Sequence, residues 1–174
     1  PEATFELALM YLYGLGVKQC KATAVLLLDA AGKKHHPLAL FKLAEYFFEN
    51  AAKADDFKKG FDACFRAAEL GLPEAQFNLG VMFEDGLGVE QNLKNAAIWY
   101  RRAAANGDER AMNNLGNLYR HGKGVDKDEL KAKAFYTLAA ENNSTFAQFN
   151  LGFLHTEGSN TNSAKAQALS LCLP

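Results

Sequence analysis

The sequence predicts an all-α protein built from helical hairpins that repeat every 36 residues along a chain of 174. Three recurring residue types support this prediction: an alanine, a leucine four residues later, and an alanine or glycine directly after the leucine. The alanines are Ala3, Ala39, Ala75, Ala111 and Ala147. The leucines are Leu7, Leu43, Leu79, Leu115 and Leu151. Such a period is typical of a solenoid, whose units bury their apolar faces only by stacking.

The first helix of each repeat is predicted from the spacing that follows its alanine, which we number as position one. Position nine carries an aromatic ring in four repeats and a histidine in the last: Tyr11, Phe47, Phe83, Tyr119 and His155. Positions one, five and nine lie along one side of an α-helix. The small residue at position six allows a neighbouring helix to approach closely. We expect His155, which takes the place of a ring, to be a core residue.

A glycine motif is expected to end the first helix in three repeats. Its three copies are Gly14-Leu15-Gly16-Val17, Gly86-Leu87-Gly88-Val89 and Gly122-Lys123-Gly124-Val125. Glycine tolerates the positive φ found directly after many helices. A phosphate-binding loop would require a preceding strand and a glycine-lysine-serine/threonine ending, which are missing here. We therefore interpret the motif as structural.

A second helix follows, and its apolar stripe is clearest in the third and fourth repeats. In the third repeat the stripe consists of Ala96, Trp99, Tyr100, Ala103 and Ala104. In the fourth it consists of Ala132, Phe135, Tyr136, Ala139 and Ala140. We predict that Asn92 and Asp128 cap the N-termini of these helices. Gly107 and Asn143 are predicted to adopt the left-handed conformation after them.

Two repeats depart from this pattern. In the second, residues 50–53 replace the glycine motif, so we expect an irregular connection, with Asp56 capping the next helix, and Ala63 and Cys64 replace the two aromatic residues. In the fifth, the pattern weakens after Gly158, and we expect a short closing helix near the chain end. The expected architecture is one domain over residues 1–174, with about four and a half repeats starting near residues 3, 39, 75, 111 and 147. We expect this domain to be a fragment of a longer protein.

Composition argues against several classes of function. The net charge is −1, with 19 basic and 20 acidic residues, whereas nucleic-acid binding favours a basic surface. No apolar run approaches the roughly 20 residues of a membrane span. The three cysteines lie far apart without zinc-ligand spacing, which predicts reduced thiols in the cytoplasm or an organelle matrix, and no metal or cofactor. Two overlapping glycosylation sequons at residues 142–145 keep the endoplasmic reticulum lumen as the alternative.

The sequence does not predict an enzyme. Neither a carboxylate pair nor a nucleophile occurs at a spacing that suggests catalysis. We expect His35 and His36, which follow two lysines, to be exposed residues of a turn. Cys64 takes the place that Tyr100 has in the next repeat, so we expect it to be buried and unreactive.

Together these motifs resemble the Sel1-like repeat, a tetratricopeptide-like module. Residues 75–107 and 111–143 match both halves of the repeat, and residues 3–17 and 147–158 match its first half. The resemblance implies a right-handed α-α superhelix that serves as a non-catalytic adaptor or scaffold for another protein. It does not extend to the cysteine-rich bacterial members, because this chain lacks their paired cysteines.

The resemblance also implies that the first helices line a concave face, where a partner protein or peptide binds. Positions three, seven, ten and eleven, together with the residue just before the alanine, lie on the side of the first helix opposite the leucine. From these positions we predict an inner face, a name that we keep for the following residues: Phe5, Leu9, Phe41, Glu45, Phe77, Val81, Arg110, Asn113, Asn117, Arg120, His121, Phe149 and Phe153. The phenylalanines at position three either pack between repeats or form an apolar groove for a partner helix or an extended peptide.

The fourth repeat contributes the most polar part of the inner face. Arginine offers a planar fork that matches a carboxylate, so we predict that Arg110 and Arg120 bind an acidic side chain or a chain terminus of the partner. The alternative for this patch is an ordinary solvated surface. The alternative function is an assembly module that forms homo-oligomers through the apolar end of the incomplete fifth repeat.

Overall fold

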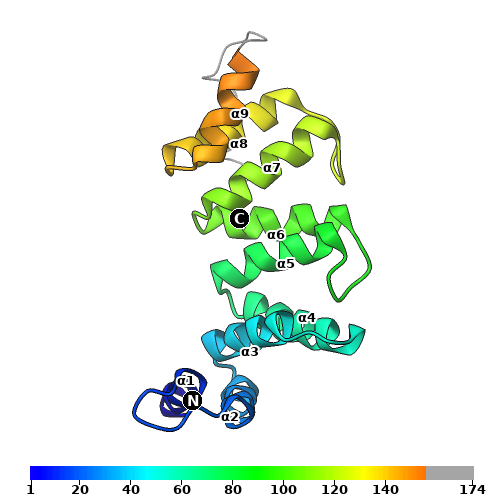
Figure 1. Ribbon diagram of the computed structural model, residues 1–174. Coiled ribbons are helices and arrows are strands. Elements are labelled where there is room, and N and C mark those ends of the chain that lie inside the picture. The colour runs from blue at the N-terminus through cyan, green and yellow to red at the C-terminus, as the bar shows by residue number, and fades with distance from the viewer. Residues whose placement is uncertain (156–174) are drawn as a thin grey trace. The chain divides into compact units, whose positions relative to one another are not determined.

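The computed structural model describes residues 1–155, and these residues form nine α-helices joined by short connections, with no strand among them (Figure 1). The all-α prediction is therefore confirmed. The helices are α1 Glu2–Tyr13, α2 Lys21–Lys33, α3 Pro37–Glu49, α4 Ala54–Glu69, α5 Pro73–Asp85, α6 Leu93–Ala105, α7 Glu109–His121, α8 Glu129–Glu141 and α9 Thr145–His155. The closing helix that we expected after α9 lies outside the described residues.

The helices pack in chain order within two compact units. The first unit comprises Pro1–Leu79 and Leu87–Glu90, and the second comprises Gly80–Gly86 and the described residues from Gln91 onward. In the first unit α1 packs on α2, α2 on α3, and α3 on α4. In the second unit α6 packs on α7, α7 on α8, and α8 on α9. The first helix of a repeat therefore contacts the second helix of the preceding repeat at α3 with α2, at α7 with α6 and at α9 with α8.

The recurring alanine and leucine form the core where a preceding helix covers them. The alanines at position one are fully buried in the four later repeats, and Leu79 and Leu115 are fully buried at position five. In the first repeat, by contrast, Ala3 is exposed and Leu7 is 40% exposed. Within the described residues, no other helix covers this side of α1. The same two residue types thus become core or surface according to their neighbours.

Local signals at the helix ends behave as predicted. Asn92 and Asp128 accept hydrogen bonds from the backbone N–H groups of Asn95 and Lys131, at 3.0 and 2.9 Å. Gly107 and Asn143 have φ angles of 89° and 68°. The irregular second connection is confirmed at residues 50–53, where Asn50 follows α3 with a φ of −111°. Asp56 caps α4 from within its first turn, because its carboxylate accepts the N–H of Lys53 at 3.2 Å.

In the third and fourth repeats, glycine at position six is required by an aromatic ring on the following helix. A Cβ atom on Gly80 would lie 2.5 Å from the buried ring of Tyr100, and one on Gly116 would lie 2.5 Å from that of Tyr136. In the first two repeats, alanine at position six accompanies a smaller residue at the place of the tyrosine. These combinations are Ala8 with Leu28 and Ala44 with Cys64.

The second glycine of the glycine motif meets the preceding repeat. A Cβ atom on Gly88 or Gly124 would come closer than 3.0 Å to backbone atoms of Phe57 or Leu93, respectively. Both glycines also have positive φ angles, 74° and 70°. Gly16 has a similar φ of 72°, but the nearest atom to its Cβ would be the terminal methyl of Met10 at 3.8 Å. Sequence reasoning explained these glycines by their backbone angle alone and missed the close approach.

The prediction that His36 is an exposed turn residue is wrong, because only 8% of it is exposed. Its Nδ1 accepts the backbone N–H of Ala39 at 3.1 Å, so the imidazole caps α3. Its Nε2 lies 2.9 Å from the Glu2 carboxylate, and its ring packs against that of Phe5 with centroids 4.6 Å apart and planes tilted by 30°. His35 is exposed as predicted, with a φ of 59°. His36 takes the register of Asp108, another N-cap, and that signal could have identified its role.

The two cysteines of the described residues are expected to differ strongly in reactivity. Burial raises the pKa of the Cys64 thiol to about 12, so about one thiol in 10⁴ is ionised at pH 8. Cys20 is half-buried, and a hydrogen bond from Thr23 lowers its pKa. Iodoacetamide followed by peptide mass spectrometry should therefore modify Cys20 quickly and Cys64 only on unfolding. Equal rates for the two cysteines in the folded protein would contradict this assignment.

The raised pKa of Cys64 also predicts a pH dependence of stability. An unfolded thiol ionises near pH 9.0, whereas the buried thiol stays protonated up to about pH 12. The free energy of unfolding should therefore be unaffected by this group below about pH 9 and should fall as the pH rises towards 12. A Cys64→Ala variant, followed by denaturant titration, should show a smaller decline over this range.

Candidate functional site

Two tyrosine hydroxyls from second helices reach the inner side of first helices within the second unit. Tyr100 of α6 donates to the Glu84 carboxylate of α5 at 2.6 Å. Tyr136 of α8 donates to the amide oxygen of Asn117 of α7 at 2.7 Å. Burial raises the pKa of both phenols, and the bond to Glu84 raises that of Tyr100 further. Both hydroxyls are therefore neutral donors that orient the polar side chains above them.

The predicted residues of α7 and α9 come together beside these hydroxyls. The Arg120 guanidinium lies over the ring of Phe153, with its carbon 4.6 Å from the ring centroid. Its charge and a hydrogen bond to Tyr136 oppose the rise in the phenol's pKa. Asn113 accepts from the Asn150 amide at 2.9 Å and is buried. The structure thus joins Asn113, Asn117, Arg120 and Phe153 in one polar-aromatic surface.

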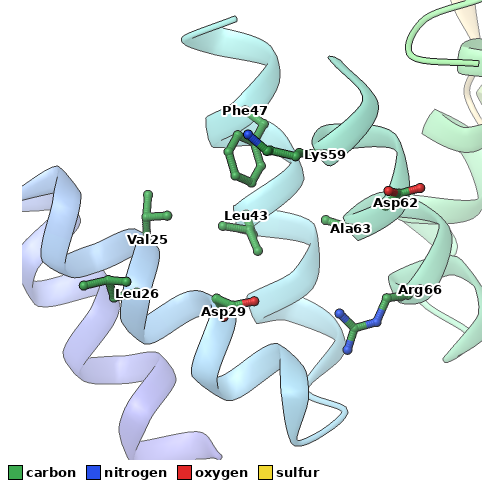
Figure 2. A pocket seen from close by; sticks show the side chains of 9 residues that line it. All are labelled: Val25, Leu26, Asp29, Leu43, Phe47, Lys59, Asp62, Ala63 and Arg66. Carbon is green, nitrogen blue, oxygen red and sulfur yellow. The ribbon is translucent and has the colours of Figure 1, made fainter. Parts of the chain in front are cut away.

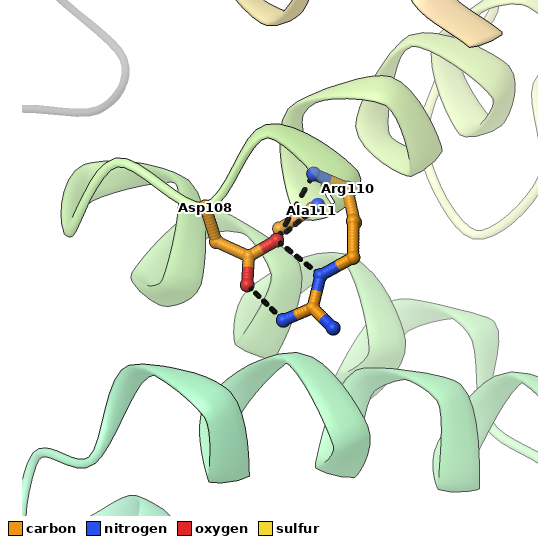
Figure 3. A network of polar contacts seen from close by, with 3 residues as sticks. All are labelled: Asp108, Arg110 and Ala111. Carbon is orange, nitrogen blue, oxygen red and sulfur yellow. Dashed lines mark hydrogen bonds and ion pairs between the residues drawn. The ribbon is translucent and has the colours of Figure 1, made fainter. Parts of the chain in front are cut away.

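Arg110 is held by the residue that caps its own helix. Figure 3 shows the Asp108 carboxylate accepting from the Arg110 guanidinium at 3.3 and 2.6 Å. The same carboxylate accepts the backbone N–H groups of Arg110 and Ala111, at 3.0 and 2.9 Å. The Arg110 side chain remains half exposed. An acidic group of a partner would therefore have to share this arginine with Asp108.

A hollow of about 250 Å³ opens beside α3 in the first unit. Glu45 of the inner face lines it, together with Leu12, Tyr13 and Glu49, which lie at positions ten and eleven of their first helices. Lys42 donates to Glu45 at 2.7 Å, and this bond raises the pKa of the lysine. Tyr13 is 56% exposed. The hollow therefore combines an exposed aromatic ring with a charged rim.

The other inner-face residues differ widely in exposure. Phe5 is buried beneath His36 and leaves little surface for a partner. The half-buried members are Leu9, Phe41, Phe77 and Val81. His121 is exposed, and Phe149 is 76% exposed. The position-three phenylalanines therefore range from core to surface along the chain.

Sequence reasoning missed the polar residues that support the inner face from beneath. The tyrosines Tyr100 and Tyr136 were assigned to the apolar stripe, but the hydroxyl of Tyr136 bonds to Asn117 of the inner face and that of Tyr100 to Glu84, at position ten of α5. Position four was not considered, although Asn114 hydrogen-bonds Tyr100 and Asn150 bonds Asn113. The recurrence of asparagine at position four, as Asn78, Asn114 and Asn150, was the available signal.

In the described part of the chain, neither a metal-ligating cluster nor a membrane-spanning helix occurs. Within residues 1–155, no three histidine, cysteine, aspartate or glutamate side chains gather in a way that could hold a metal ion. None of the helices in this part of the chain is both long and apolar enough to cross a bilayer. The groups that the structure brings together are amides, hydroxyls, a guanidinium and phenyl rings, which bind through hydrogen bonds and stacking.

Stacked helical hairpins with a polar-aromatic surface define a helical repeat protein of the tetratricopeptide-like class. The chain belongs to the Sel1 repeat family, whose repeat matches residues 1–36, 37–72, 73–108, 109–144 and 145–171. Proteins with Sel1 repeats are generally adaptors for protein interaction and typically non-catalytic. A curated relative, the chitin synthase regulator SKT5 of Saccharomyces cerevisiae, is 37% identical over 72 residues, which cover 40% of this chain and 10% of the regulator.

Solved structures of the same family share the fold. A Sel1 repeat protein from Oxalobacter formigenes has a TM-score of 0.76 and 30% identity over 87% of this chain and 62% of its own. The protective antigen c5321 of uropathogenic Escherichia coli has a TM-score of 0.80 and 28% identity over 98% of this chain and 36% of its own. The chain thus spans a tenth of the curated regulator and less than two thirds of each of these two structures.

The fold also resembles a cysteine-rich member of the family, which we did not expect from the missing cysteines. Helicobacter pylori cysteine rich protein B is 25% identical, with a TM-score of 0.53 over 66% of this chain and 96% of its own. Cys20 and Cys64 of our chain are free thiols. The hairpins therefore stack here without a disulfide at either cysteine, through the buried alanines, leucines and rings described above.

Proposed function

We propose that this protein is a non-catalytic adaptor that binds a partner protein or peptide on the inner face of its first helices. The observation that carries the proposal is the polar-aromatic surface of the second unit, where Asn117 and Arg120 are held by Tyr136 beside the exposed ring of Phe153. Pre-positioned amide and guanidinium groups lose little conformational entropy on binding. Exposed rings beside them supply apolar anchors.

The surface favours a partner segment that carries both an apolar side chain and an acidic group. The rings of Phe149 and Phe153, 76% and 51% exposed, would contact the apolar part. Arg120 and the half-exposed Arg110 would bind a carboxylate of the partner. The Arg110 guanidinium would then bond to this carboxylate and to that of Asp108 at the same time. The hollow beside Tyr13 and Glu45 offers a second contact within the first unit.

Removing both arginines is the sharpest test of this proposal. Partners captured from native cells would be located on the chain by cross-linking and mass spectrometry, and the affinity of one verified partner measured by calorimetry. The Arg110→Ala/Arg120→Ala variant should weaken that affinity about tenfold or more, because each arginine supplies a charge-assisted hydrogen bond. Thermal unfolding would report any loss of stability from the broken contacts with Asp108 and Phe153.

A matched control removes the same charge elsewhere. Lys94 and Lys123 are exposed residues of α6 and of the connection after α7. The Lys94→Ala/Lys123→Ala variant should bind the verified partner as the native protein does. Equal affinities for the native protein and the arginine variant would eliminate the arginines as partner contacts. Cross-links confined to second helices would overturn the inner face as the binding surface.

A second candidate function is assembly into a homo-oligomer, and the exposed rings of α9 favour it. Phe146 and Phe149 are 80% and 76% exposed on this helix. Apolar surface of this kind often marks an interface. Light scattering separates the two functions, because an adaptor should be a monomer that captures its partner, whereas an assembly module should form a closed oligomer. A Phe146→Ser/Phe149→Ser variant should then dissociate that oligomer.

A further inference from the structure

A hollow of about 360 Å³ lies between the second helices of the first two repeats, away from the inner-face residues. Figure 2 shows Val25, Leu26 and Asp29 of α2 on one side and Lys59, Asp62, Ala63 and Arg66 of α4 on the other. Leu43 and Phe47 of α3 lie between them and form the apolar floor. The volume is within the range of small-molecule and side-chain binding pockets.

The other repeats show why this hollow exists. Ala63 has the register of Trp99 in the third repeat and of Phe135 in the fourth, and both of those rings are buried. In the fourth repeat, Phe135 stacks on the position-nine ring of Tyr119, with centroids 5.6 Å apart and planes 7° apart. In the second repeat, the position-nine ring is Phe47, and Ala63 offers it no ring. The hollow is thus lined by Ala63 and by the ring that an aromatic partner would stack on.

The hollow is also lined by an arginine whose equivalent in the third repeat lies over the tryptophan ring. In the third repeat the Arg102 guanidinium lies 4.4 Å from the Trp99 ring centroid. Arg66 has the register of Arg102 and lines the hollow, although Ala63 carries no ring. A hydrogen bond of 2.9 Å to the carbonyl of Gly32 holds its guanidinium in place. From the α4 side, the Lys59 ammonium lies 6.0 Å from the centroid of the Phe47 ring, which belongs to the floor.

We propose that this hollow is a binding site for an aromatic side chain, and best for the indole of a tryptophan, carried by a partner polypeptide. The ring would stack on Phe47 and lie beneath the Arg66 guanidinium, which reproduces the arrangement of Trp99 with Arg102 in the next repeat. A cation gains most from the face of an indole. The site is separate from the inner face and does not depend on the function proposed for it.

The test uses indole as the probe, because it is the ring alone. Methyl NMR spectra of the whole chain should show saturable shifts at Ala63, Leu43 and Val25, with a dissociation constant on the order of 1 mM for a ligand of this size. Cyclohexylmethanol, which is apolar but has no π face, should bind at least threefold more weakly. Absence of saturable shifts at these methyl groups in the native protein would overturn the proposal.

Two variants distinguish a built ring site from a nonspecific apolar hollow. Ala63→Trp supplies the missing ring from within and should weaken indole binding at least tenfold. The matched control Ala105→Trp adds the same ring at an exposed position of α6 and should leave binding unchanged. Arg66→Gln keeps the hollow and should reduce the preference for indole over cyclohexylmethanol. Unchanged indole binding by the Ala63→Trp variant would refute the assignment. An unchanged preference for indole over cyclohexylmethanol in the Arg66→Gln variant would also refute it, and this second test holds even if Ala63→Trp does not fold.

Discussion

Replacing Gly124 with alanine is expected to lower the free energy of unfolding by about 3–4 kcal/mol, a large effect for a single methyl group. Part of this loss, about 1 kcal/mol, comes from the φ of 70°, which alanine adopts poorly. The larger part arises because the new methyl would meet the backbone of Leu93 at the start of α6. Backbone atoms cannot turn aside as a flexible side chain can. Denaturant titration of the two proteins measures the difference.

Gly16→Ala is the matched control for this prediction. Gly16 occupies the same place in the glycine motif and has a nearly identical φ of 72°, but the nearest atom to its Cβ position is the Met10 methyl at 3.8 Å, an ordinary van der Waals contact. Its replacement should therefore lower the free energy of unfolding by only about 1 kcal/mol. Equal losses for the two variants would show that the backbone angle alone demands these glycines. The difference between them measures the contact between consecutive repeats, which stabilises arrays of this kind.

Replacing Gly116 with alanine is expected to lower the free energy of unfolding by about 2–3 kcal/mol, although alanine is the better helix former. Its methyl would lie 2.5 Å from the ring of Tyr136, which is fully buried and bonded to Asn117. The ring could make room only by breaking that hydrogen bond or by moving α8 away from α7. Gly152→Ala, where no described atom lies within 4 Å, should be neutral or slightly stabilising.

A double-mutant cycle tests whether the ring itself demands the glycine. Tyr136→Leu alone should destabilise the protein, because it leaves space in the core and removes the partner of Asn117. The Gly116→Ala/Tyr136→Leu variant restores the combination found at Ala8 and Leu28 in the first repeat. Its loss of stability should be smaller than the sum of the single losses by at least about 1 kcal/mol. Additive losses of unfolding free energy would show that Tyr136 is not the reason why Gly116 must be a glycine.

Much of the fold could be predicted because its signals lie within a few residues of one another. Asn92 and Asp128 cap helices through N–H groups three residues ahead, and Asn143 ends its helix through its own φ. His36 was misjudged because the neighbours that bury it, Glu2 and Phe5, are more than 30 residues away. The register that His36 shares with Asp108 could indicate the cap, but no neighbouring residue in this basic turn indicates the contacts with Glu2 and Phe5.

The inner face was predicted only in part for the same physical reason. Helical spacing placed Asn117 and Arg120 on one side of α7, and the structure brings them together. Spacing could not show that Arg110 folds back onto Asp108 or that Phe5 is covered by His36. Nor could it show that the hydroxyl groups of the buried Tyr100 and Tyr136 reach polar side chains of the first helices, Glu84 and Asn117.

The sequence by itself determined the repeat, the helix ends that carry a glycine motif or a cap such as Asn92 and Asp128, and the membership of the Sel1 family. These signals are readable because helical periodicity, caps and positive-φ residues act over a single turn. The tertiary structure alone decided which residues at the same position of different repeats have different contacts. Gly16 and Gly124 share a backbone angle, and Ala63 and Trp99 share a register, yet their surroundings differ. Those surroundings consist of atoms from other helices, and their distances arise only when the hairpins stack.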